Sequence, residues 1–224
     1  MKKVASKKTK KKTMATKAQS SSDDKRSQEG NNKQEGANGN MNKQNGRGSQ
    51  QGGEQTLHTL LETGLKDIYS AEKQLVEALP EVIQAVDDEE LEEAVTNHLE
   101  QTKKHVQRLE KVFERLGLQK ESEEKCKAME GLVEESKKVI QEFQRGPVRD
   151  AALIIGCQKI EHYEIASYGS LCELADVLEE ERIGDLLGRT LEEEEDTDEL
   201  LSEIAQDVND QAAEMSFQEQ EEFR

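Results

Sequence analysis

Residues 149–171 read RDAALIIGCQKIEHYEIASYGSL, and this stretch decides how the chain folds. Apolar residues recur in it at intervals of three and four, which is the spacing of one face of an α-helix. The same face carries two acids, Glu161 and Glu164, between Cys157 and Tyr168. A carboxylate is almost never fully buried without a partner, because burial of an uncompensated charge costs several kcal/mol or shifts the pKa until the group is neutral. The stretch therefore predicts a helix whose inward face contains a polar site.

Helical periodicity continues on both sides of this stretch. The sequence predicts five helices in all, over about residues 56–86, 89–116, 123–143, 148–178 and 181–205. Gly117 should end the second helix, and Pro147 should open the fourth. Pro80 falls inside the first helix and should kink it near Leu79.

The links between the predicted helices indicate their topology. Short links make the first and second helices an antiparallel hairpin, and likewise the fourth and fifth. Roughly 30 residues separate the second helix from the fourth, which is enough to cross the length of a bundle. The predicted fold is therefore all-α: a ferritin-like antiparallel four-helix bundle with a long crossover that carries an extra helix.

The composition excludes several other classes of protein. Of the 224 residues, 33% are hydrophobic, 36% are charged and none is Trp, and strong helix formers outnumber the β-branched and aromatic residues that sheets prefer. No apolar run approaches the roughly 20 residues that a membrane-spanning helix needs. No signal peptide is visible, because the N-terminal lysines are not followed by an apolar stretch. We expect a cytoplasmic protein with reduced thiols at Cys126, Cys157 and Cys172, which cannot all pair within one chain.

Charge is distributed unevenly along the chain. Residues 1–55 hold 13 Lys and Arg against five Asp and Glu, a net charge of +8, whereas the remainder carries −26. We expect residues 1–55 to form a disordered, basic, low-complexity tail, because they have too little apolar surface to offset the entropy of ordering. Residues 56–205 are then the ferritin-like helical domain, and 206–224 an acidic or polar C-terminal extension. The eight lysines of residues 1–22 favour either non-specific contact with nucleic acid or a tail that only solubilises the protein.

Five acids occupy positions where the helical pattern favours apolar residues. They are Glu72, Glu161, Glu164, Glu194 and Asp198. At a rise of 1.5 Å per residue, counting from the helix links places these acids and His105 within roughly one helical turn of a common level. The hairpins of both halves would therefore present them to the midpoint of the bundle. His98 lies nearer the first link and off that level, although Pro80 could shift the register. A cation between the acids would offset their repulsion.

Carboxylates and imidazoles that converge between four helices are the ligands of a di-iron or di-manganese site. The sequence predicts such a site, with iron or manganese as the ion and with the ligands Glu72, His98, His105, Glu161, Glu164, Glu194 and Asp198. The alternative is a row of acids that is partly exposed at a groove or paired with inner lysines. No Lys or Arg occupies the predicted inner rows, which weakens the pairing version of that alternative.

Several segments of the chain resemble the YciE/YciF stress-protein family, which is a ferritin-like group. They lie in order across residues 57–205, so that the resemblance covers essentially the whole predicted helical domain. The segments are LKDIYSAEKQL at 65–75, HLEQTKKHVQRL at 98–109, KCKAMEGLVE at 125–134, the stretch at 149–171 and TLEEEEDTDELL at 190–201. Within the fourth of them, EHYEIASYG is the most specific motif.

The resemblance implies a ligand pattern that this chain follows in part. Ferritin-like di-iron proteins use one Glu on the first bundle helix, Glu-x-x-His on the second, one or two Glu on the third and Glu-x-x-His on the fourth. Glu72 matches the first helix, Glu161 and Glu164 match the third, and Glu194 matches the fourth. On the second helix, Thr102 stands three residues before His105, where the pattern requires Glu. On the fourth helix the His partner of Glu194 is missing, and Asp198 lies at i+4 instead. These departures leave open whether one or two metal ions bind, and whether any ferroxidase-like or peroxidase-like chemistry survives.

Three functions follow as hypotheses. The first is a metal-binding protein that acts in stress or oxidant protection, by oxidation of bound Fe(II) with O₂ or peroxide. The second is a metal-free helical bundle that serves as a homodimeric interaction or scaffold module. The third adds association with DNA through the lysine-rich residues 1–22.

Other side chains are weaker candidates for a site. His162 points away from the inner row and His58 stands at a helix start, so both are expected at the surface. Tyr69, Tyr163 and Tyr168 are expected to pack near the site with satisfied hydroxyl groups.

Overall fold

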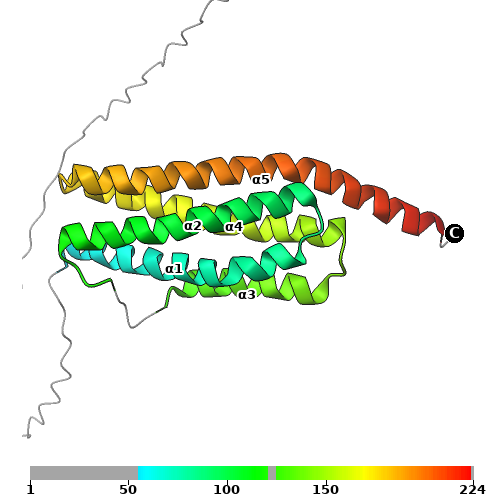
Figure 1. The fold of residues 1–224 in the computed structure, drawn as a ribbon, viewed down its shortest axis with the longest axis horizontal. Helices are drawn as coiled ribbons and strands as arrows, with labels where there is room; N and C mark the ends of the chain where they lie inside the picture. The colour runs from blue at the N-terminus through cyan, green and yellow to red at the C-terminus, as the bar shows by residue number, and fades with distance from the viewer. Residues whose placement is uncertain (1–54, 121–124, 223–224) are drawn as a thin grey trace, which may run out of the picture. The chain divides into compact units, whose positions relative to one another are not determined.

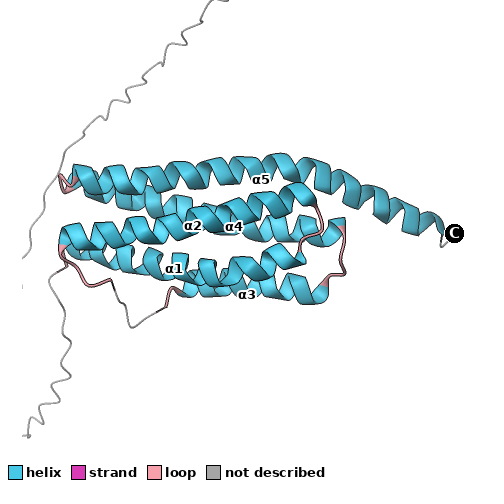
Figure 2. Ribbon diagram, in the orientation of Figure 1, coloured by secondary structure: helices cyan, strands magenta, loops and turns pink. Residues whose placement is uncertain are grey.

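The structure of the chain is a computed structural model that describes residues 55–120 and 125–222, with the side-chain surroundings given up to residue 215. The predicted tail, including the lysines of residues 1–22, lies outside the described residues except for Gln55. The described part contains no strand and five helices (Figure 2), which are α1 (Leu57–Ala85), α2 (Glu89–Leu116), α3 (Lys127–Glu142), α4 (Pro147–Val177) and α5 (Glu181–Glu222).

Local sequence signals account for the helix ends. The side chain of Thr56 caps α1, and the carboxylate of Asp88 accepts hydrogen bonds from the first backbone N–H groups of α2. Gly117 ends α2 in the left-handed conformation, with φ of 65°, which costs glycine no steric strain. Pro147 occupies the first turn of α4, where a missing backbone N–H does no harm. The predictions for Gly117 and Pro147 are therefore confirmed.

Two antiparallel hairpins make up the bundle (Figure 1). Helix α1 packs against α2, α4 packs against α5, and α2 joins the two hairpins by packing against α5. Helix α3 lies in the crossover between α2 and α4 and packs against α1 and α4. This arrangement confirms the predicted four-helix bundle with an extra helix in its long connection.

The core consists of apolar side chains from all five helices. Its largest fully buried apolar side chains include Leu65, Leu75, Phe113, Met129, Ile154 and Leu187. Gly64 allows α1 to approach α4 closely, because a Cβ atom at this position would lie only 2.8 Å from Cδ2 of Leu171. Close packing of this kind holds the inner faces of the helices in a defined register.

Helix α5 is longer than the sequence predicted. Its expected end near Ala205 is wrong, because the helix continues to Glu222 and extends past the other helices (Figure 1). The buried Val208 continues the helical spacing of Leu201 and Ile204 beyond that point, and no Gly or Pro interrupts residues 206–222. Helix α1 runs through Pro80 to Ala85, close to its predicted end at residue 86. Among the described residues, no helix combines the length and the apolar character that crossing a bilayer requires.

Candidate metal centre

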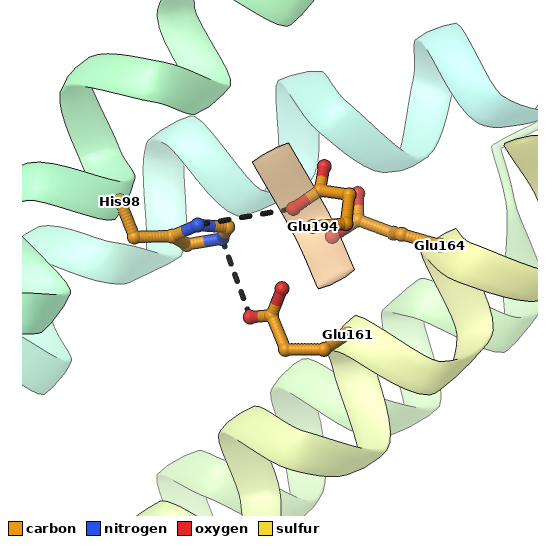
Figure 3. Close-up of side chains that lie close together, drawn as sticks. All are labelled: His98, Glu161, Glu164 and Glu194. Atoms are coloured by element: carbon orange, nitrogen blue, oxygen red, sulfur yellow. Dashed lines mark ion pairs between the residues drawn. The ribbon is translucent and has the colours of Figure 1, made fainter. Parts of the chain in front are cut away.

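Four buried side chains converge between α2, α4 and α5 (Figure 3). They are His98, Glu161, Glu164 and Glu194, and their ligand atoms all lie within 4.8 Å of one another. Nε2 of His98 is 3.4 Å from Oε1 of Glu161, and its Nδ1 is 3.9 Å from Oε2 of Glu194. None of the four is more than 4% exposed. We call this group the His98 group.

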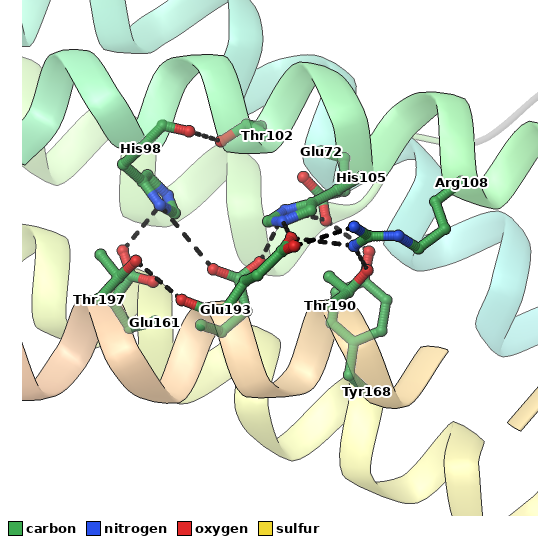
Figure 4. A network of polar contacts seen from close by, with 11 residues as sticks. Glu72, His98, Thr102, His105, Arg108, Glu161, Tyr168, Thr190, Glu193 and Thr197 are labelled. Atoms are coloured by element: carbon green, nitrogen blue, oxygen red, sulfur yellow. Dashed lines mark hydrogen bonds and ion pairs between the residues drawn. The ribbon is translucent and has the colours of Figure 1, made fainter. Parts of the chain in front are cut away.

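A second group lies beside the first and shares Glu194 with it. Its other members are Glu72 from α1 and His105 from α2 (Figure 4), and the ligand atoms of the three again lie within 4.8 Å of one another. Nδ1 of His105 is 3.0 Å from Oε1 of Glu194 and 3.5 Å from Oε1 of Glu72. We call it the His105 group. One oxygen of Glu194 faces each imidazole, so this carboxylate connects the two groups.

Many polar atoms of the two groups make no hydrogen bond. They include both carboxylate oxygens of Glu164 and of Glu194, Oε2 of Glu72, Oε2 of Glu161 and both ring nitrogens of His98. Buried polar atoms in native proteins are nearly always satisfied by a protein group, an ordered water or an ion. Together the groups present four carboxylates and two imidazoles, which is the donor set of dinuclear carboxylate centres in bundles of this kind. The residues present therefore fit a pair of iron or manganese ions.

The electrostatics of the His98 group favour a cation. Burial, together with the neighbouring carboxylates, raises the pKa of Glu161 and of Glu164 well above the usual value. Burial lowers the pKa of His98, so that the imidazole is neutral at pH 7 and keeps a lone pair for a metal. A bound dication would reverse the penalty on the carboxylates, because it favours their ionised form.

The His105 group is balanced differently. Burial opposes a charge on His105, but its ion-pair contacts with Glu194 and Glu72 prevail and raise its pKa to about 10. Burial also raises the pKa of Glu72, whereas for Glu194 the interaction with His105 outweighs burial and lowers the pKa. In the metal-free state a charged His105 thus occupies the place of a cation. A metal ion bound by Nδ1 would displace that proton.

A layer of polar residues surrounds the ligands (Figure 4). The hydroxyl of the fully buried Tyr168 donates a hydrogen bond to Oε1 of Glu72. Glu193 contacts Nε2 of His105 at 2.7 Å and receives hydrogen bonds from Arg108. Glu193 and Arg108 were not predicted from the sequence, because acids and bases on a helix surface are usually solvated. The only available signal was their position beside Glu194 and one turn after His105.

His98 supplies the imidazole that the fourth bundle helix lacks. Three residues after Glu194 stands Thr197, whose hydroxyl donates to the backbone carbonyl of Glu193. Thr197, His98 and Glu161 line the same small cavity, so the ring of His98 enters from α2 the region where a histidine of α5 would lie. His98 thus belongs to the cluster although it precedes His105 by seven residues on α2. Thr102, which replaces the expected Glu, is fully buried and donates its hydroxyl to the carbonyl of His98.

The remaining candidates from the sequence lie outside the two groups. Asp198 is half-buried and pairs with the exposed His162, at 3.1 Å between Oδ2 and Nε2. His58 is exposed, as expected. The hydroxyls of Tyr69 and Tyr163 donate to Glu110 and Asp67, so neither is directed at the ligands.

Fold and site together define the class of this protein. It is a ferritin-like four-helix bundle with a buried cluster of carboxylates and imidazoles between its helices. The chain belongs to the family described as Domain of unknown function (DUF892), whose model matches residues 56–214. This confirms the resemblance found in the sequence.

Relatives support the same assignment. The chain is 48% identical over 141 residues to Protein YciF of Escherichia coli K12, a match that covers 63% of this chain and 85% of that protein. The crystal structure of the E. coli stress protein YciF is similar with a TM-score of 0.67 at 43% identity, and the match covers 70% of this chain and 98% of that one. The structure of YcfI from Rhodopseudomonas palustris matches with a TM-score of 0.63 at 40% identity, covering 66% of this chain and 94% of that one.

Proposed function

We propose that this protein binds two iron or manganese ions in the interior of its bundle and that the pair of ions serves in stress or oxidant protection. The observation that carries the proposal is the burial of four carboxylates whose oxygens largely lack hydrogen-bond partners. Such a cluster is unfavourable by itself, because the desolvation of each carboxylate is compounded by repulsion from the next. Two dications would neutralise the four carboxylates.

Each residue has a definite part in this proposal. His98, Glu161 and Glu164 would hold one ion, Glu72 and His105 would hold the other, and Glu194 would bridge them. Hard carboxylate oxygens suit Mn and Fe, and imidazole suits Fe. Iron bound there would supply electron exchange with O₂ or peroxide, which is the chemistry of oxidant protection. The residues themselves would bind the ions and exclude bulk water, and Tyr168 would orient Glu72 through its hydrogen bond.

The similar E. coli protein is described as a stress protein, which agrees with a protective role. The acidic character of the chain, with a net charge of −18, also favours accumulation of cations near its surface. The donor set accommodates both Fe(II) and Mn(II).

Metal binding to matched variants tests the proposal. The metal-free protein is loaded anaerobically with Fe(II) and, separately, with Mn(II), and bound metal is measured after the excess is removed. We expect about two ions per chain in the native sequence and a loss of at least one in Glu194→Gln, because both groups depend on this carboxylate. Glu195→Gln removes an exposed acid from the next position and should bind as the native protein does.

The same samples provide a thermal test. A ligand that binds only the folded state raises the melting temperature, so metal should stabilise the native protein and the Glu195→Gln control. A chelator should reverse the effect. Negligible retained metal in the native protein, together with a melting temperature that ignores both metal and chelator, would reject the proposal in favour of a metal-free bundle.

A further inference from the structure

Glu193 lies on the opposite side of His105 from the candidate metal ligands. Its Oε2 is 2.7 Å from Nε2 of His105 (Figure 4), whereas Nδ1 of the same ring faces Glu194 at 3.0 Å. The two nitrogens of one imidazole therefore contact adjacent residues of α5. The ring is fully buried, while the Glu193 side chain is 32% exposed, so Glu193 forms part of the wall between the site and the surface.

Arg108 holds Glu193 in this position. Its Nη1 donates to Oε2 of Glu193 and its Nη2 donates to Oε1, each at 3.0 Å. The same Nη1 donates to the hydroxyl of the buried Thr190 at 2.5 Å. A planar guanidinium that binds both oxygens of a carboxylate restricts its orientation more than a single contact can. Arg108 follows His105 by three residues, so both side chains lie on one face of α2 and both contact Glu193.

We propose that Glu193 is a positioning residue that selects Nδ1 of His105 as the metal-binding nitrogen. This inference rests on the proposed function. By accepting the Nε2–H group, Glu193 leaves the lone pair of Nδ1 directed at Glu72 and Glu194. Histidine ligands in metalloproteins commonly donate their other N–H to a carboxylate, which fixes the ring and increases its basicity. Arg108 in turn positions Glu193.

The two groups differ in this respect. His98 has no equivalent partner, since neither of its ring nitrogens makes a hydrogen bond. Glu193 should therefore affect only the ion held by the His105 group. A salt bridge that merely stabilised the surface would have no such selectivity.

Metal titration of the full-length chain with Co(II) tests the inference, because its visible absorption reports the ligands of each ion. Glu193→Ala should lower the affinity for one of the two ions by roughly 10- to 100-fold and leave the affinity for the other unchanged within about twofold. Glu192→Ala, an exposed neighbour, is the matched control and should bind both ions as the native protein does. Glu193→Gln retains a weaker acceptor oxygen and should lose affinity for the same ion to a smaller degree, which also covers the case in which the alanine variant fails to fold.

A structural readout accompanies the titration. In the Zn(II)-loaded native chain with ¹⁵N-labelled histidine, we expect Nδ1 of His105 to show the shift of a metal-bound nitrogen and Nε2 to carry a slowly exchanging proton. In Glu193→Ala that proton should exchange rapidly. If both Glu193 variants bind each ion with the same affinity as the native protein, this inference is overturned and the proposed function is not. Failure of the native chain to bind metal would overturn the proposed function, and with it this inference.

Discussion

Glu194 is the residue on which the site depends. Its two oxygens lie 3.0 Å from Nδ1 of His105 and 3.9 Å from Nδ1 of His98, so one side chain connects both groups. It is fully buried, and its charge is stabilised in the metal-free state chiefly by His105. Around it, Glu161 and Glu164 have no basic partner of comparable strength. The cluster is therefore unfavourable by itself, as the proposed metal centre requires.

Replacement of Glu161 by Gln should stabilise the metal-free protein. The pKa of Glu161 is raised well above its usual value by burial and by its acidic neighbours, so its charge is unfavourable at pH 7. A neutral amide of the same shape removes that repulsion, and we expect a gain of about 1 kcal/mol or more in the free energy of unfolding, or a melting temperature higher by about 2–4 °C. Thermal unfolding monitored by circular dichroism in chelator measures it.

Metal should reverse the ranking of the two proteins. The native sequence gains stability from added Mn(II), whereas Glu161→Gln gains much less because a ligand is lost. Glu173→Gln on the exposed face of α4 should change neither value. A metal-free Glu161→Gln protein that is less stable than the native one would show that the carboxylate forms favourable contacts instead.

Cys157 should resist thiol reagents in the folded protein. It is 7% exposed, and burial next to Glu161 raises its pKa to about 12. Because the thiolate is the reactive species, labelling with iodoacetamide at pH 8 should reach Cys157 only after unfolding. Half-buried Cys172 should be labelled first. Peptide mass spectrometry distinguishes the two, and equal labelling rates in the native state would contradict this packing.

At the scale of the elements, α5 contributes to the bundle beyond its predicted end. Val208 is 1% exposed although it lies three residues past Ala205. Val208→Ala should lower the free energy of unfolding by about 1–3 kcal/mol, because it removes buried methyl groups and leaves a cavity. Met215→Ala, at a position that is 42% exposed, should cost less than about 0.5 kcal/mol. Urea unfolding measures both values, and equal small losses would mean that Val208 adds nothing to the core.

The sequence predicted much of the fold and of the inner layer of the site. The spacing of apolar residues, together with Gly117 at a helix end and Pro147 at a helix start, predicted the helices. The presence of acids on apolar faces predicted the site residues Glu72, Glu161, Glu164 and Glu194. The end of α5 was missed because apolar residues are sparse there, and a weak stripe resembles a polar extension.

The position of His98 along the bundle agrees with the count of residues in the helices. The count expected the other ligands at one common level, whereas the side chains that share Glu194 spread along the axis. His98 and His105 are seven residues apart, which corresponds to roughly 10 Å along a helix.

Helical periodicity could not predict the residues that contact the ligands from outside, Glu193 and Arg108. Adjacent residues on a helix point about 100° apart, so the inward direction of Glu194 gave no signal that Glu193 contacts the site. A long side chain can nevertheless reach around the helix to the far edge of an imidazole. Only coordinates show that Glu193 and Arg108 meet at His105.

At the scale of the whole molecule, metal-free and metal-loaded protein should respond to pH in opposite directions. Glu161 and Glu164 have raised pKa values in the folded state, relative to an ordinary value of 4.5. Their contribution to stability is therefore fully present below about pH 4.5 and is lost as the pH rises through the folded values. The pKa of His105 is raised from 6.5 to about 10, so its contribution to stability is likewise lost as the pH rises from about 6.5 to about 10.

Acidification from about pH 8 to 5.5 should thus raise the melting temperature of the metal-free protein. Metal-loaded protein should lose stability over the same range, because protons compete for the ligands. The double variant Glu161→Gln/Glu164→Gln controls for the acidic surface, and its metal-free protein should show a flatter pH dependence. Parallel pH profiles for the metal-free native and double-variant proteins would count against buried ionisable carboxylates.

The most direct measurement is an anomalous difference map from a crystal of the protein grown with Mn(II). We predict two peaks inside the bundle, one among His98, Glu161 and Glu164 and the other between Glu72 and His105, with Glu194 bound to both. A map with no peak in the interior, and with those carboxylates hydrogen-bonded to waters or to protein groups, would contradict the proposed metal centre.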